Sequence, residues 1–75
     1  MGEVNISGNR RANFAAILAD VEVGTEVTYH IGEFAAGPHK SAAMEAEAKG
    51  ACFLYQRKQS DRLFAYIAKK RLNSK

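Results

Sequence analysis

The side chains that could bind a metal or act as nucleophiles are few and widely spaced. Cys52, His30 and His39 are the only soft ligands, and none stands in a CxxC or HxxxH spacing. A cysteine–histidine nucleophile would require the fold to bring Cys52 to one histidine. Otherwise Cys52 is a small buried hydrophobe at the start of a strand. The sequence therefore predicts no metal site and no cofactor.

The remaining residue types do not supply a catalytic site either. Glu45 and Glu47 lie about 160° apart around a helix that turns about 100° per residue, so they do not form a catalytic pair. No serine stands in a GxSxG turn, and no glycine-rich loop precedes a helix in a way that would cradle phosphate. We expect no catalytic residues and a protein that is not an enzyme.

Charge is distributed unevenly along the chain, and this asymmetry points to a binding function. Residues 1–50 hold four lysines and arginines against seven acidic residues, a net charge of −3. Residues 51–75 hold seven against one, a net charge of +6. A basic face of this kind is typical of a protein that binds nucleic acid, although an acidic protein surface would also fit.

The predicted contacts to nucleic acid are the basic residues around one turn and near the end of the chain, with two residues at a helix start. Arginine and lysine on phosphates add affinity without sequence information, and glutamine adds hydrogen bonds. The alternative for the turn is a solvated loop that protects an edge strand. The predicted residues are Lys40, Ser41, Arg57, Lys58, Gln59, Arg62, Lys69, Lys70 and Arg71.

The size of the chain allows one thin domain. A chain of 75 residues buries about 60% of the surface that its unfolded form exposes. We expect a flexible arm over residues 1–8, a single domain over 9–69 and a basic tail over 70–75. A single cysteine and no apolar run of about 18 residues predict a reduced cytoplasmic protein without a membrane span.

Hydrophobic periodicity predicts the first two elements. Phe14, Ile17, Leu18 and Val21 follow the i, i+3, i+4, i+7 pattern of one helix face, within a helix over residues 10–21 capped by Asn9. Residues 26–31 alternate polar and apolar as a half-buried strand, with Val27, Tyr29 and Ile31 on one side. After Gly32, residues 33–36 suffice for about one helical turn.

The second half predicts a helix followed by a hairpin. The alanine-rich helix spans residues 38–49, and Gly50 ends it. Its outward side chains include two glutamates and no arginine, asparagine or glutamine, which makes it a poor reader of bases. Residues 51–57 and 62–68 read as two strands joined by residues 58–61. A helix over residues 61–72 is the alternative.

These elements give the order helix, strand, helix, helix, strand, strand, which is that of an α+β winged helix-turn-helix. The chain also resembles small uncharacterised winged-helix proteins of bacteriophages and prophages. The resemblance covers about residues 27–71 and is carried by YHIG at residues 29–32, QR at 56–57 and YIAKKR at 66–71. It implies a winged fold and a phage or mobile-element origin, in a bacterial host cell.

Two functions of different classes are consistent with these features. The first is a small double-stranded DNA-binding protein that contacts the backbone through its basic wing, as a transcriptional regulator or accessory factor. The second is an anti-CRISPR-like inhibitor that binds a host protein complex through the same scaffold. A homodimer is compatible with both, since two-fold pairing is the usual form of association.

Overall fold

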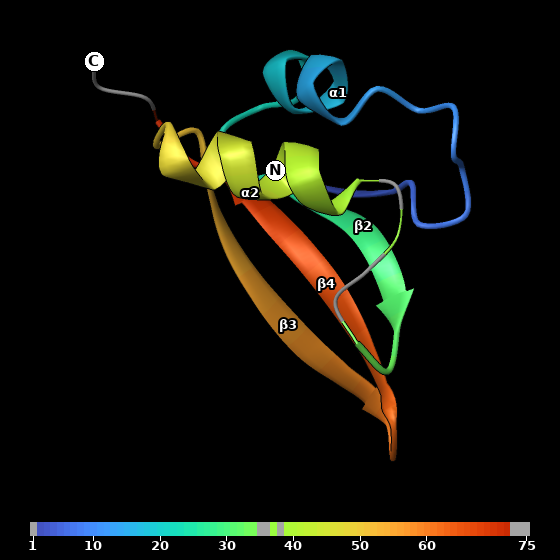
Figure 1. The fold of residues 1–75 in the computed structure, drawn as a ribbon. Coiled ribbons are helices and arrows are strands. Elements are labelled where there is room, and N and C mark those ends of the chain that lie inside the picture. The colour runs from blue at the N-terminus through green and yellow to red at the C-terminus, as the bar shows by residue number, and fades with distance from the viewer. Residues whose placement is uncertain (1, 35–36, 38, 73–75) are drawn as a thin grey trace.

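The computed structural model describes residues 2–34, 37 and 39–72. Two helices pack against one four-stranded sheet, and the element order is strand, helix, strand, helix, strand, strand (Figure 1). The elements are β1 (Glu3–Asn5), α1 (Phe14–Asp20), β2 (Glu26–Gly32), α2 (Lys40–Ala48), β3 (Cys52–Ser60) and β4 (Leu63–Lys70).

This order shows that the predicted winged helix-turn-helix is wrong. The described residues contain two helices, and β2 separates them, so no pair of helices is joined by a short turn. The segment predicted as an extra helical turn forms a bend at Glu33 and Phe34, and its last two residues, 35 and 36, lie outside the described residues. The α+β class is retained, but the recognition-helix arrangement is absent from the described chain.

The N-terminal segment contains a strand in place of the expected flexible arm. β1 pairs parallel with β2, with Val4 opposite Val27. Ile6 follows, buried, and its backbone N–H donates to Thr28 O at 2.9 Å. A three-residue strand carries too little pattern to be recognised in a sequence, because its stability comes from a partner more than 20 positions away.

The strand order is β1-β2-β4-β3, with β4 antiparallel to both β2 and β3. The hairpin prediction for residues 51–68 is therefore confirmed over its helical alternative. The strands are longer than predicted, and β4 continues through Lys70, the first residue of the expected basic tail. Residues 73–75 of that tail lie outside the described residues.

The helix positions are confirmed with shorter bounds. Asn13, instead of Asn9, caps α1, since its side-chain oxygen accepts from Ala16 N at 3.0 Å. Asn9 accepts from Arg11 N and forms a turn before the helix. Gly50 follows α2 with φ +81°, a conformation that glycine adopts easily. The predicted start of α2 at Pro38 lies outside the described residues.

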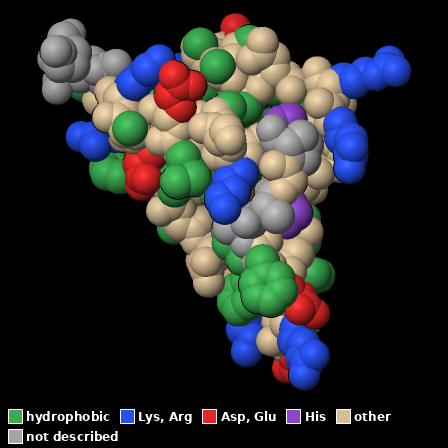
Figure 2. Space-filling view, in the orientation of Figure 1, with side chains coloured by type: hydrophobic (Ala, Val, Ile, Leu, Met, Phe, Trp, Pro, Cys, Tyr) green, Lys and Arg blue, Asp and Glu red, His purple; other side chains and the backbone are tan. Residues whose placement is uncertain are grey.

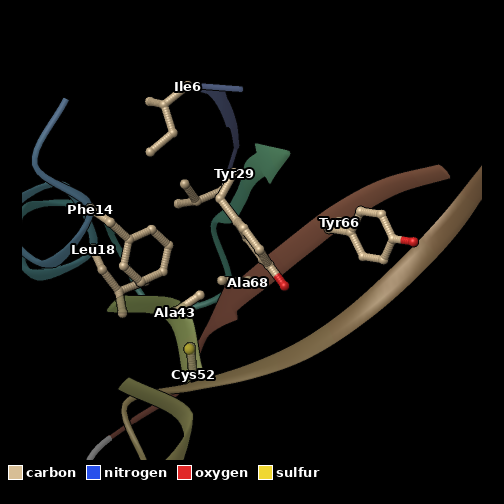
Figure 3. Packing of buried hydrophobic residues seen from close by; sticks show 9 residues of the cluster. Ile6, Phe14, Leu18, Tyr29, Ala43, Cys52, Tyr66 and Ala68 are labelled. Carbon is tan, nitrogen blue, oxygen red and sulfur yellow. The ribbon is translucent and has the colours of Figure 1, made fainter. Parts of the chain in front are cut away.

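The core lies between the helices and the sheet (Figure 3). Phe14 and Leu18 of α1 and Ala43 of α2 pack toward Tyr29 and other buried sheet residues. Phe14 and Tyr29 meet edge to face, with ring centroids 5.9 Å apart. The small side chains of α2 allow it to approach the sheet closely. Among the described residues, no helix is long and apolar enough to cross a membrane.

A bulge in β2 alters the predicted alternation of its side chains. The pairing with β4 shifts between Thr28 and His30, so that His30 lies opposite Tyr66 and Ile31 opposite Ala65. The side chains of Tyr29 and His30 therefore both lie on the side of the sheet that the helices cover. The side chain of Ile31 lies on the opposite side, which we call the open face of the sheet. The prediction that Ile31 shares a side with Val27 and Tyr29 is therefore wrong.

Candidate nucleic-acid interface

The β3–β4 hairpin continues past the helices as a two-stranded projection, which we call the hairpin arm (residues 56–64). Figure 1 shows both strands running away from α1 and α2 to the far end of the molecule. Every residue from Gln56 to Leu63 is exposed. The arm holds together through backbone pairing, including Lys58 opposite Phe64, rather than through a side-chain core. It is therefore a surface element on a folded body.

Three of the predicted contact residues lie freely exposed on this arm. Lys58, Gln59 and Arg62 surround the turn, and within the described chain their side chains make no hydrogen bond or ion pair. Asp61 lies between them in sequence. Figure 2 shows basic and acidic side chains gathered at this end of the molecule. The two cations are available to an anionic partner without breaking any internal contact.

Arg57 has a different role, because it is engaged with the sheet. Its Nη2 lies 3.3 Å from Glu26 Oε1, and its guanidinium stands 6.0 Å from the centre of the Tyr55 ring. The Tyr55 hydroxyl donates to Glu26 Oε2 at 2.5 Å. This hydrogen bond, followed by the positive charge of Arg57, lowers the pKa of Glu26. Burial, and then the bond to Glu26, raise the pKa of Tyr55 to about 12.

The predicted residues at the end of β4 mostly serve the fold. Lys70 Nζ donates to Ala19 O at 3.0 Å and to Val21 O at 2.7 Å. It thereby satisfies carbonyls at the end of α1, where a positive charge is favourable. The Arg71 guanidinium lies 4.6 Å from the centre of the Phe53 ring. Lys69 is exposed and makes no hydrogen bond in the described chain, but it lies directly opposite Glu26 on β2, and its positive charge contributes to lowering the pKa of that carboxyl.

The nine predicted residues therefore do not form one patch. Arg62 lies in the turn just before β4, and Lys69 lies seven positions further on, which corresponds to about 23 Å at about 3.3 Å per residue. Lys40 and Ser41 occupy a third place, exposed in the first turn of α2. The described cations of residues 57–71 are thus divided between the two ends of β4. Among the residues that the structure describes, only the hairpin arm combines free cations with a projecting shape.

The outward face of α2 carries acidic side chains, as predicted. Glu45 lies 3.5 Å from Lys49 in an exposed i, i+4 pair. Glu47 Oε2 accepts from the backbone N–H of Leu54 at 3.4 Å, at the free edge of β3. Met44 is also exposed. This face has no free cation among its described residues apart from Lys40, which makes it a poor surface for phosphate.

The three soft ligands take part in packing and hydrogen bonding within the fold. Cys52 is fully buried, as predicted, and burial, followed by the charge of Glu47, raises the pKa of its thiol to about 11. His39 is buried and its Nε2 lies 2.8 Å from Asn9 O. The His30 ring lies against that of Tyr66, with centroids 5.7 Å apart and the planes tilted by 33°. No cluster that could hold a metal ion was found among residues 2–34, 37 and 39–72.

The Glu26–Tyr55–Arg57 cluster was missed at the level of sequence. It joins β2 to β3 across β4 on the open face of the sheet. One signal was available, because Tyr55 and Arg57 are two positions apart and share a side of a strand. Their partner Glu26 lies about 30 positions earlier, and only the strand order brings it near.

Comparison of the chain with models of protein families, with curated proteins and with solved structures gave no match. The functional argument therefore depends on the surface of the molecule itself.

Proposed function

We propose that this protein binds double-stranded DNA through the tip of the hairpin arm, without enzymatic activity. The observation that carries the proposal is the pair of unpartnered cations, Lys58 and Arg62, on a two-stranded projection beyond the body. Gln59 between them adds a hydrogen-bonding group. Lys69 is a secondary cation at the other end of β4.

The shape of the arm is suited to a DNA groove. Neighbouring strands lie about 4.8 Å apart, and a two-stranded ribbon fits the major groove, which is about 12 Å wide. The arm carries Arg57, Lys58 and Arg62 against Asp61, so it is positive overall. Lysine and a single arginine beside phosphates give affinity that depends on salt and little on sequence.

The binding is tested by fluorescence anisotropy of a mixed-sequence duplex at low and at moderate salt. The wild-type protein is expected to bind more weakly as salt rises. Replacing both Lys58 and Arg62 by alanine should weaken binding to every sequence and reduce the slope of log affinity against log salt by about 2, since each phosphate contact contributes about 0.9.

A matched control keeps the change in charge but moves it away from the arm. Arg10 and Arg11 are exposed in the loop before α1, and replacing both by alanine also removes two positive charges. This variant should keep most of the affinity and the salt slope. Equal losses in the two double variants would mean that net charge alone drives binding, and the arm would not be the site.

The biological role that we propose is that of a phage or mobile-element regulator or accessory factor in the bacterial cytoplasm. The support is the small size, the free basic arm and the YHIG, QR and YIAKKR segments described above. Binding that does not discriminate between sequences favours an accessory factor, whereas preference for one operator-like sequence favours a regulator. Competition between labelled and unlabelled duplexes of different sequence separates the two roles.

A second candidate function is supported by a different surface. A hollow of about 560 Å³ between α1, α2 and the end of β4 is lined mainly by apolar groups, including Ala15, Leu18 and Ala46. Val23 and Leu72 at its border are 49% and 71% exposed. An inhibitor that binds a host protein would use such a surface. Absence of DNA binding at low salt would favour this candidate over the first.

A further inference from the structure

The longest strand of the sheet has a free edge. In the described part of the chain, the order β1-β2-β4-β3 leaves β3, a strand of nine residues, paired on one side only. The N–H of Leu54 points away from β4, because it donates to Glu47 instead. Since backbone groups alternate along a strand, those of Gln56 and Lys58 face the same free edge. A long edge of this kind is a template for another strand.

The edge contains a symmetric, regular stretch. β3 pairs with β4 without interruption from Cys52 to Lys58, and the register shifts only after Lys58. Tyr55 is the centre of these seven residues. If two copies of β3 align antiparallel about Tyr55, Leu54 of each copy lies opposite Gln56 of the other. Both residues have outward-facing backbone groups, so the hydrogen bonds match.

Charge favours a second copy as the strand that occupies this edge. On the helix-covered side of the sheet, Glu47 reaches the edge at Leu54, near the start of β3, and Lys58 projects on the same side near the far end of the strand. Antiparallel alignment brings Lys58 of one copy to Cys52 of the other, near Glu47. The arrangement is isologous, so the favourable charge contact occurs twice.

The open face of the sheet adds matching side chains. Phe53, Tyr55 and Arg57 project to this face, and Phe53 is 52% exposed. The same alignment places the two Tyr55 rings beside each other. Cross-strand aromatic pairs stabilise such a pairing. Ile67, buried behind Tyr55 on this face, then continues an apolar row across both copies.

We propose that the protein forms a two-fold dimer in which the β3 strands of two copies pair antiparallel about Tyr55, giving one continuous eight-stranded sheet. In the single chain, the Glu47 carboxylate accepts a hydrogen bond from Leu54 N and so occupies one donor of the free edge. On pairing, that N–H bonds to Gln56 of the second copy, and Glu47 turns to the incoming Lys58.

Sedimentation of the full chain over micromolar to millimolar concentrations tests the pairing. The wild-type mass is expected to rise from 8.2 kDa to twice that value. Gln56→Pro should stay monomeric at all concentrations, since it removes an outward N–H but no bond to β4, and proline is tolerated on edge strands. Gln56→Ala keeps the N–H and should dimerise. An unchanged far-ultraviolet circular dichroism spectrum establishes that Gln56→Pro is folded.

Disulfide trapping tests the register. Tyr55→Cys, in a chain with Cys52→Ala, should form an intermolecular disulfide on oxidation, because residues facing each other across the two-fold axis have Cβ atoms about 5 Å apart. Asp61→Cys in the same background should stay reduced, since it lies at the arm tip. A wild-type monomer throughout, a dimer that survives Gln56→Pro, or equal trapping at both positions would each overturn the proposal.

Lys58 takes part in both proposals, so the pairing is tested at Gln56 and Tyr55, which the DNA proposal does not use. A monomer that binds DNA through Lys58 and Arg62 would reject the dimer and leave the proposed function standing. A dimer without DNA affinity would do the reverse.

Discussion

The two ends of the β3–β4 hairpin contrast sharply, although the same two strands form both. At the body end, Ala68 and Cys52 are fully buried beneath the helices. At the arm end, Leu63 is 39% exposed and all of residues 56–63 face solvent. The body is stabilised by apolar burial, whereas the arm is stabilised mainly by backbone hydrogen bonds.

This difference means that the residues that stabilise the fold and the residues proposed to bind a partner lie in separate regions. Substitutions in the arm remove few buried contacts, so they should change surface chemistry without unfolding the protein. Substitutions in the body remove core contacts from a domain of only 75 residues, whose stability is small. The following three predictions test this division, beginning with the largest expected effect.

A matched pair of leucines compares the two regions directly. Leu18 of α1 is 4% exposed in the core, and Leu63 of β4 is 39% exposed on the arm. Leu18→Ala should lower the free energy of unfolding by about 3 kcal/mol, because it leaves a cavity. Leu63→Ala should lower it by less than about 1 kcal/mol. Urea unfolding of both variants measures the difference, and similar losses would refute the division into body and arm.

The junction between body and arm gives the second prediction. A Cβ added at Gly32 would lie 2.9 Å from His30 Nε2, and the ring is held beside Tyr66. Gly32→Ala should therefore cost about 1–3 kcal/mol through overpacking. Gly8→Ala, where a Cβ would meet no atom within 4 Å, is the control for the loss of glycine.

A double variant identifies the cause of this loss. His30→Ala removes the ring that the new Cβ would strike, so combining it with Gly32→Ala should recover part of the stability lost on the single glycine change. If urea unfolding shows that the double variant loses the sum of the free energies lost by the two single variants, the contact with His30 does not cause the destabilisation by Gly32→Ala.

The smallest predicted effect concerns pH and the Tyr55–Glu26 hydrogen bond, which lies in the body immediately before the arm begins. The pKa of Glu26 is lowered in the fold, so its contribution is present above its ordinary value of 4.5 and is lost as pH falls below that value. The pKa of Tyr55 is raised from 10.0 to about 12, so its contribution is lost as pH rises through that interval.

Tyr55→Phe keeps the ring and removes the hydroxyl. The variant should therefore lose stability less steeply than wild type at both extremes, with a difference well below that of the leucine pair. Thermal unfolding against pH for the two proteins measures this. Cys52 also has a raised pKa, but it is present in both proteins and its effect cancels in the comparison. If the melting temperatures of the two proteins changed with pH in parallel, the hydrogen bond would be excluded as the source of the pH dependence.

Most of the individual elements could be predicted from local pattern. Phe14 and Leu18 are the buried positions of a helical stripe, and the alternation of aromatic residues identified β3 and β4 as strands. Two elements were predicted wrongly. β1 is held by a parallel partner, and the turn after Gly32 was read as an additional helix, which produced the wrong fold family.

The candidate site was predicted only in part, for a similar reason. Residue type identified Lys58 and Arg62 as cations beside a turn, and both are free on the hairpin arm. Residue type could not distinguish them from Lys70, which bonds to two carbonyls of α1. Nor could it show that Arg57 would be engaged by Glu26. Residues with the same charge therefore differ in whether their side chains are free to contact a partner.

The sequence by itself determined the helix faces, the hairpin and the uneven distribution of charge, because these follow from side-chain period, turn residues and composition. Only the tertiary structure decided the strand order, the free edge of β3 and which cations remain unpaired. The physical reason is that pairing between strands joins positions far apart in the chain. That pairing is selected by the packing of the whole core, which no local window of residues contains.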